Sequence, residues 1–96
     1  MKYRYRFTVF TPCYNSEKSI HRVYESLINQ TFKDFEWLVI NDASTDSTDE
    51  IIQSYINTAP FTINYIVNEQ NQMLSENFNK AFKLAKGEYM VFIGHD

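Results

Sequence analysis

The chain has 96 residues and a net charge of −3, with 44% hydrophobic, 17% aromatic and 22% charged residues. This length allows one domain, and the composition is that of a globular chain with enough apolar side chains to fill a core. The nine Lys and Arg residues form no run or stripe that could follow a phosphate backbone, which argues against a nucleic acid partner.

Signals for membranes, secretion and disulfides are also missing from the sequence. Apolar stretches such as 37–40 and 90–93 are far shorter than the roughly 20 residues that cross a bilayer. The basic residues within 1–6 precede no long apolar segment, so we predict no secretory signal. The single cysteine, Cys13, excludes an internal disulfide, and we interpret it as a small, partly buried side chain. We therefore expect a cytoplasmic protein.

The first half of the chain alternates strand and helix patterns. Residues 7–11 are β-branched and aromatic and predict a strand, which we expect to end at Pro12 because proline cannot continue a ladder. Apolar residues at helical spacing from Ile20 to Ile28 predict a helix after the polar Asn15 and Ser16, with Glu17 in its first turn, where the helix dipole favours negative charge. The near-continuous apolar run 35–40 predicts a strand covered on both faces of a parallel sheet.

A second helix follows a polar loop. Ser47 and Glu50 have the spacing of a capping box, in front of an apolar stripe that ends at Ile56. Residues 61–67 alternate in polarity and predict a third strand.

A third helix and a fourth strand complete the chain. We expect the helix to end at Gly87 in the C′ position, and residues 88–93 to form a strand that leads to 94–96. The buried stripe of this helix should consist of Leu74, Phe78, Ala81, Phe82 and Ala85.

The order β-α-β-α-β-α-β with short connections predicts an α/β fold. We expect a mostly parallel, Rossmann-like sheet of four strands with helices on both faces, in one domain without repeats or linkers. Ligands of such sheets bind outside the carboxyl ends of the strands. The polar segments that lie there are 11–15, 41–44, 68–71 and 94–96.

Only two glycines occur in the chain, so neither a G-x-G-x-x-G fingerprint nor a P-loop can form. This excludes dinucleotide-dependent oxidoreductases of the usual type and P-loop NTPases.

Four segments of the sequence, in order, resemble glycosyltransferase family 2, whose members have the GT-A fold. Together they cover essentially the whole chain. They are 8–15 (TVFTPCYN), 26–32 (SLINQTF), 35–46 (FEWLVINDASTD) and 85–93 (AKGEYMVFI).

The resemblance implies that residues 1–96 are the N-terminal, nucleotide-sugar-binding part of a glycosyltransferase domain whose acceptor-binding half is absent. Such an enzyme transfers a sugar, with inversion, from a nucleotide diphosphate donor to a saccharide or lipid-linked acceptor, and depends on Mn²⁺ or Mg²⁺. A UDP-sugar is the expected donor. The catalytic base would lie later in the chain, so we expect the fragment alone to bind nucleotide weakly and not to turn over.

The family expectation places the full protein at the inner face of a membrane, in polysaccharide or cell-envelope synthesis. We also expect dimers, because the fourth strand would expose apolar surface at a sheet edge.

Several residues match positions of the family's nucleotide site. Tyr14 matches the aromatic residue that stacks on the base, and the backbone of Pro12 would lie against the nucleotide. Asp42 matches the acid that accepts from the ring N–H of uracil or thymine. Glu17 falls near the base and ribose, and Asn79 matches an asparagine of the helix before the metal strand.

The remaining candidates complete this site. Asp96 matches the aspartate that ligates the divalent metal on the diphosphate. Thr11 and Ser44 belong to the polar strand ends assigned to nucleotide binding, and Gly94 stands where many members have an acid that contacts ribose.

Other positions depart from the family pattern. Asn41 and Ala43 replace the more usual Asp and Gly beside Asp42, Met73 stands where Gly is common, and Phe78 stands where Arg is frequent. The last two changes affect the sugar end of the pocket.

Simpler interpretations exist for these residues. Tyr14 could only cover the sheet edge, Asp42 could only form a turn, and Glu17 could be placed by the helix dipole alone. Asn79 could form only local hydrogen bonds.

Two other function classes are alternatives to a glycosyltransferase. A nucleotidyltransferase shares the architecture, but residues 12–19 lack its glycine-rich, basic loop. A non-catalytic nucleotide- or glycan-binding module of the same fold stays open, because Gly94 removes an acid and the catalytic base lies outside the sequence.

Overall fold

The computed structural model describes residues 3–94 and contains seven regular elements. Their order is the predicted alternation of strands and helices. The elements are β1 (Tyr5–Cys13), α1 (Ile20–Ile28), β2 (Phe35–Asp42), α2 (Thr48–Thr58), β3 (Thr62–Asn68), α3 (Met73–Leu84) and β4 (Gly87–Phe92).

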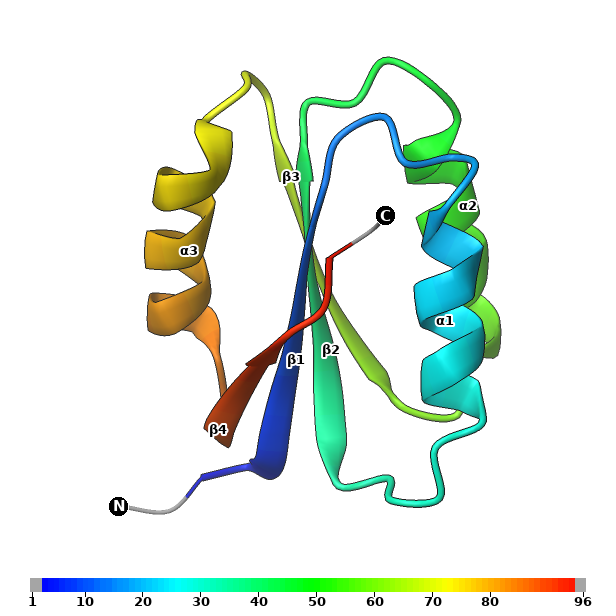
Figure 1. The fold of residues 1–96 in the computed structure, drawn as a ribbon, viewed down its shortest axis with the longest axis vertical. Coiled ribbons are helices and arrows are strands. Elements are labelled where there is room, and N and C mark those ends of the chain that lie inside the picture. The colour runs from blue at the N-terminus through cyan, green and yellow to red at the C-terminus, as the bar shows by residue number, and fades with distance from the viewer. Residues whose placement is uncertain (1–2, 95–96) are drawn as a thin grey trace.

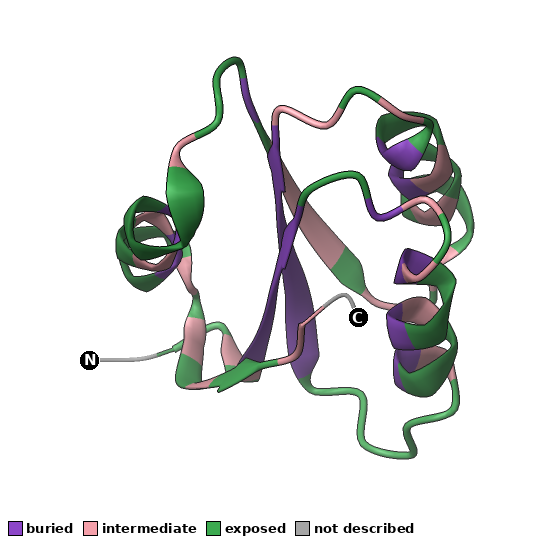
Figure 2. Ribbon diagram, turned by 45° about the horizontal axis from the view of Figure 1, so that its top comes forward, coloured by how far each residue is buried: buried purple, intermediate pink, exposed green. Residues whose placement is uncertain are grey.

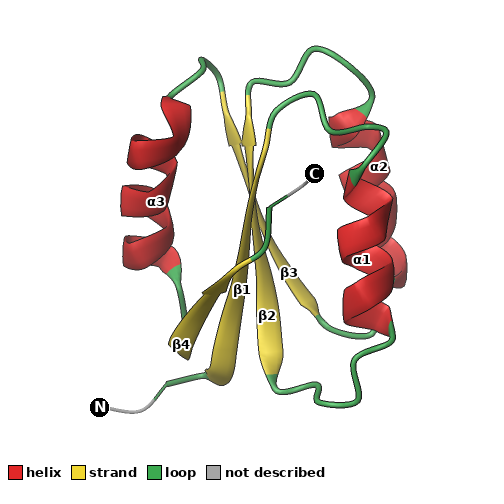
Figure 3. Cartoon of the chain, in the orientation of Figure 1, coloured by secondary structure: helices red, strands yellow, loops and turns green. Residues whose placement is uncertain are grey.

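The four strands form one parallel sheet in the order β3-β2-β1-β4. Helices α1 and α2 cover one face and α3 covers the other, which makes three layers (Figures 1 and 3). The chain winds outward from β1 to β3, crosses the sheet through α3 and returns to pair β4 with β1. The α/β fold class and the helices on both faces are therefore confirmed.

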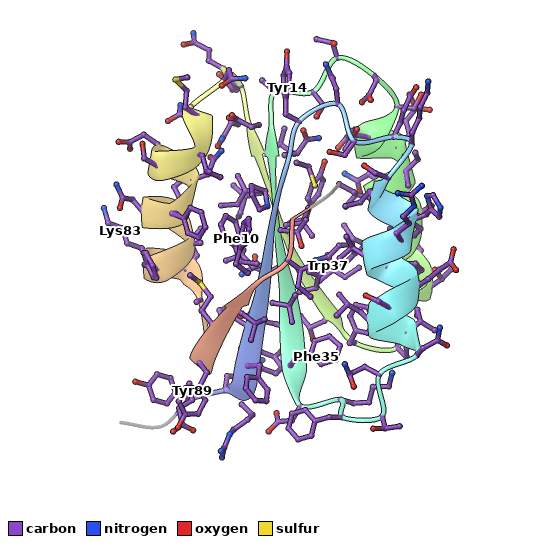
Figure 4. All side chains as sticks on the ribbon, viewed as in Figure 1. Phe10, Tyr14, Phe35, Trp37, Lys83 and Tyr89 are labelled. Atoms are coloured by element: carbon purple, nitrogen blue, oxygen red, sulfur yellow. The ribbon has the colours of Figure 1, made fainter. Side chains whose placement is uncertain are left out.

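Strand β2 is the centre of the molecule, and every one of its residues is buried. Trp37 packs on the α1 and α2 side, whereas Leu38 and Ile40 pack with Phe10 and Ala81 on the α3 side. Figure 4 shows Phe10 and Trp37 on opposite faces of the sheet. Burial falls off toward β4, which carries no buried residue (Figure 2).

An unexpected carboxylate lies inside the apolar β2. Glu36 is fully buried, and its Oε2 accepts hydrogen bonds from Thr8 Oγ1 at 2.7 Å and from the Lys86 N–H at 2.6 Å. Thr8 Oγ1 in turn accepts from the Gly87 N–H at 2.9 Å. These bonds attach the start of β4 to the two central strands.

Gly87 is therefore a strand residue, and its expected C′ position after α3 is wrong. The helix ends at Leu84, and its C-cap Ala85 is already extended. A Cβ on Gly87 would lie 2.4 Å from backbone atoms of Phe7 and Thr8, so close approach between β4 and β1 requires glycine.

The expected end of the first strand at Pro12 is also wrong. Pro12 pairs with Ile40, and β1 continues to Cys13. Among residues 3–94, pairing between β1 and β4 stops at Phe10, so no described strand pairs with that side of β1 beyond this residue. Proline is tolerated there because its missing N–H is not needed for a ladder.

The helix starts differ from the expected ones. Ser47 is the N-cap of α2 but forms no side-chain cap, so the capping box with Glu50 is wrong. Instead, Asp46 Oδ1 accepts from the Thr48 N–H at 3.0 Å. Glu17 precedes α1, which begins at Ile20, and does not lie in its first turn.

The expected buried stripe of α3 is correct only in part. Ala81 is buried, but Leu74 and Phe82 are 55% and 66% exposed. The other buried residue of this helix is polar, Asn77. Cys13, expected to be partly buried, is fully buried.

Three non-glycine residues adopt left-handed backbone conformations at the carboxyl edge of the sheet, two in loops and one at the first position of α3. They are Asn15 (φ 50°), Ala43 (φ 62°) and Met73 (φ 67°). Glycine adopts this left-handed conformation without steric strain, which explains why the family pattern has glycine at the positions of Ala43 and Met73.

We expect Ala43→Gly to increase the free energy of unfolding by about 0.5–1 kcal/mol, because relief of left-handed strain outweighs the added entropy of the unfolded chain. Denaturant unfolding measures this change. The matched control is Ala85→Gly, where φ is −63° and glycine should lower stability. A loss of stability in Ala43→Gly would contradict the strain argument.

Candidate functional site

A pocket of about 260 Å³ opens at the carboxyl edge of the sheet, on the side covered by α3. It lies where the winding of the chain reverses between β1 and β4, which is where open α/β sheets bind ligands. Its lining comes from the ends of three strands and from α3. The residues are Pro12, Cys13, Tyr14, Asp42, Leu74, Asn77, Phe92 and Gly94.

Four candidate residues meet in this pocket, namely Pro12, Tyr14, Asp42 and Gly94. The side chain of Tyr14 is 47% exposed and stands at the end of the sheet (Figure 4). A half-exposed ring at the mouth of a pocket offers an apolar face on which a planar base can stack.

Asp42 is the acceptor of the pocket and is only 5% exposed. Its Oδ1 accepts from Asn68 Nδ2 at 2.9 Å and from the Gln72 N–H at 2.7 Å, and its Oδ2 accepts from the Met73 N–H at 3.1 Å. Burial opposes ionisation, but these hydrogen bonds, together with one from Asn77, lower the pKa of the Asp42 carboxyl below its ordinary value. The group is a carboxylate at neutral pH.

Asn77 is absent from the sequence-based candidates and Asn68 is present only within the polar segment 68–71, although both side chains hold Asp42. Asn68 Nδ2 also donates to Asn77 Oδ1 at 2.8 Å, and Lys80 Nζ donates to Asn68 Oδ1. Helical spacing was the sequence signal that could have identified Asn77, because this residue lies four positions before the buried Ala81 and on the same helix face.

The candidate Asn79 is not brought to the pocket. It is exposed on α3, two residues and about 200° around the helix from the pocket-lining Asn77.

Three further candidates belong to the scaffold around the pocket. Thr11 is fully buried on the α1 and α2 side, where its Oγ1 accepts from Trp37 Nε1 at 2.9 Å. Ser44 Oγ accepts from the Asn15 N–H at 2.9 Å, and Glu17 Oε1 accepts from the Ser47 N–H at 2.9 Å.

The position of Thr11 follows from the alternation of side chains along a strand. Odd-numbered residues of β1 and β2, such as Thr11 and Trp37, face α1 and α2. Even-numbered residues, such as Phe10 and Asp42, face α3 and the pocket.

The metal assignment falls on Asp96, which lies outside the described residues together with its neighbour His95. Within residues 3–94, no three His, Cys, Asp or Glu side chains gather as metal ligands. The assignment of Asp96 as the metal ligand stays a prediction.

Cys13 contributes to the pocket wall but not to chemistry. It is fully buried, and this burial raises the pKa of its thiol to about 12. The group stays protonated at neutral pH and is a poor nucleophile.

Residues 8–96 match the sequence model of the family described as Glycosyl transferase family 2. The chain belongs to this family. Family 2 membership confirms the resemblance on which the candidate site was based.

The names of two relatives of this family 2 chain refer to poly(ribitol-phosphate) and to teichoic acid. Poly(ribitol-phosphate) beta-N-acetylglucosaminyltransferase TarS of Staphylococcus aureus is 34% identical over 93 residues, which cover 95% of this chain and 16% of TarS. Minor teichoic acid biosynthesis protein GgaB of Bacillus subtilis is 34% identical over 96 residues, which cover 98% of this chain and 11% of GgaB.

Solved structures share the fold. TarS residues 1–349 in complex with UDP-GlcNAc superpose with a TM-score of 0.87 at 36% identity, covering 95% of this chain and 26% of that chain. Mannosyltransferase PcManGT from Pyrobaculum calidifontis, in complex with GDP-Man and Mn²⁺, gives a TM-score of 0.88 at 26% identity, covering 99% and 28%. The GT-A fold is thus confirmed, and the chain spans less than a third of each of these relatives.

No helix within residues 3–94 has the length and apolar character of a membrane span.

The lowered pKa of Asp42 predicts a pH dependence of stability. Its stabilising contribution should be complete above the ordinary value of 3.8 and should be lost as the pH falls through the lower folded-state pKa. The difference in unfolding free energy between the wild-type chain and Asp42→Asn, measured by denaturant titration, should therefore shrink from pH 5 to pH 2. A difference that stays constant over this range would contradict the ionised, hydrogen-bonded state.

Proposed function

We propose that this chain binds the nucleotide of a UDP-sugar in the pocket between β1, β4 and α3, and so forms the donor-binding part of an inverting glycosyltransferase. The observation that carries the proposal is the meeting of Tyr14 and Asp42 in one pocket, a half-exposed ring beside an ionised acceptor. The pocket lies at the reversal of strand order, where nucleotides bind in related architectures.

The two side chains have complementary tasks. The Tyr14 ring stacks on the base, which contributes about 1–3 kcal/mol in comparable base–aromatic contacts. Asp42 accepts the ring N–H of uracil, whereas cytosine presents an acceptor at that position and would face the carboxylate with like polarity. The ionised state of Asp42 therefore favours uracil over cytosine.

Asp42 already accepts several hydrogen bonds, and one of them can be exchanged for a bond from the base. The Met73 N–H is shared between Asp42 Oδ2 and Asn71 Oδ1, each at 3.1 Å. When a base N–H takes Asp42 Oδ2, Met73 keeps Asn71 as its acceptor. The exchange leaves no buried donor unpaired.

For the whole protein we propose metal-dependent transfer to a saccharide or lipid-linked acceptor in cell-envelope synthesis. The names of TarS and GgaB, which refer to poly(ribitol-phosphate) and teichoic acid, support a role in polymer synthesis, and the Mn²⁺ complex of the mannosyltransferase supports a cation. The cation would stabilise charge on the diphosphate leaving group, and Asp96 is the proposed ligand. Dimer formation and a position at the inner face of a membrane stay predictions.

The base-binding proposal is tested by calorimetric titration of the chain with UDP and CDP. Tyr14→Ala should weaken UDP binding by about tenfold or more, while Tyr14→Phe, the matched control, should bind like the wild type because stacking does not need the hydroxyl. Asp42→Asn should lower the ratio of UDP to CDP affinity, because an amide can donate to cytosine. Equal binding of UDP by wild type and Tyr14→Ala would contradict the site.

A further inference from the structure

The two loops that follow β1 and β2 are joined by side-chain hydrogen bonds. Asn15 forms the first part of this junction: its Oδ1 accepts from the Thr45 N–H at 2.8 Å and from Thr45 Oγ1 at 3.4 Å. Its own N–H donates to Ser44 Oγ at 2.9 Å. Both the side chain and the backbone of Asn15 therefore bind the neighbouring loop.

Asp46 organises the second part of the junction. Its Oδ1 accepts from the hydroxyl and the N–H of Thr48, and its Oδ2 accepts from the Glu17 N–H at 3.2 Å. The Thr48 hydroxyl donates its proton to Asp46, and its oxygen accepts from the Ser16 N–H at 2.8 Å. Glu17 Oε1 closes the junction by accepting from the Ser47 N–H.

Tyr14 lies at the end of this junction. Its N–H donates to Ser16 Oγ at 3.2 Å, and the next residue, Asn15, has the left-handed backbone that turns the chain. Neither Asn15 nor Asp46 lines the pocket. Their contacts hold the backbone on which the half-exposed Tyr14 ring is mounted, and Asn15 is the residue next to Tyr14 in the chain.

We infer that Asn15 and Asp46 are positioning residues of the nucleotide site, which order the loop of Tyr14 before the base arrives. The inference rests on the proposed function. Fixing the backbone of a residue opposes binding through lost entropy, and a loop that is already ordered in the free protein avoids this loss on binding. Weakening the junction should therefore reduce nucleotide affinity without removing any group that touches the nucleotide.

Asn15→Gly is the test variant, because glycine accepts the φ of 50° while the side-chain acceptor is lost. Asn15→Asp keeps an acceptor oxygen and is the conservative variant. Tyr24→Phe is the matched control: the Tyr24 hydroxyl lies 3.2 Å from Thr58 Oγ1 and also connects α1 with α2, but Thr58 is at the far end of α2 from this junction.

The expected result is a loss of about tenfold in UDP affinity for Asn15→Gly, with Asn15→Asp and Tyr24→Phe close to the wild type. In a double-mutant cycle, Asn15→Gly should cause little further loss in a Tyr14→Ala background, because it acts through that ring. The backbone amide of Tyr14 should also show a lower heteronuclear NOE in free Asn15→Gly than in the free wild type.

Three outcomes would overturn the inference: wild-type affinity in Asn15→Gly, an undiminished loss in the Tyr14→Ala background, or an unchanged NOE at Tyr14. Affinity lost in Tyr14→Ala but kept in Asn15→Gly would refute the positioning role and leave the nucleotide site intact. No binding of UDP to the wild type would refute both, whereas the NOE would still report whether the junction orders the loop.

Discussion

Burial of β2 on both faces is the constraint on which the site depends. Trp37 packs against α1 and α2 while Leu38 and Ile40 pack under α3, so the strand cannot slip by one residue without exchanging its two faces. This register puts the side chain of Asp42 on the α3 side, in the pocket. The electrostatic part of the site is therefore a consequence of how the core is packed.

The two sides of the pocket are held by separate networks. On the α3 side, Asn68 and Asn77 surround Asp42 and keep it ionised. On the α1 and α2 side, Asn15 and Asp46 join the loops that carry Tyr14. One network thus sets the charge and acceptor direction of the site, and the other sets the position of its aromatic ring.

The alternation of strands and helices and the ligand edge were predictable because they follow from apolar patterns and from the parallel topology. Contacts between residues that are distant in the sequence were not predictable from these patterns. Glu36 is a carboxylate in an otherwise apolar strand, and only the structure shows that Thr8 and Lys86 donate hydrogen bonds to it. The expected capping box at Ser47 does not form, and Asp46 accepts from the Thr48 N–H instead. Asn79 matches the family pattern but is exposed, whereas Asn77, on the same helix face as the buried Ala81, lines the pocket.

The most direct test of the account is a crystal structure of the chain soaked with UDP. The account predicts the uracil ring stacked on Tyr14 at about 3.5–4 Å, with its ring N–H about 2.7–3.2 Å from Asp42 Oδ2 and the Met73 N–H retained by Asn71. A uracil bound elsewhere, for example in the apolar hollow lined by Phe7, Leu27 and Phe32, would contradict it.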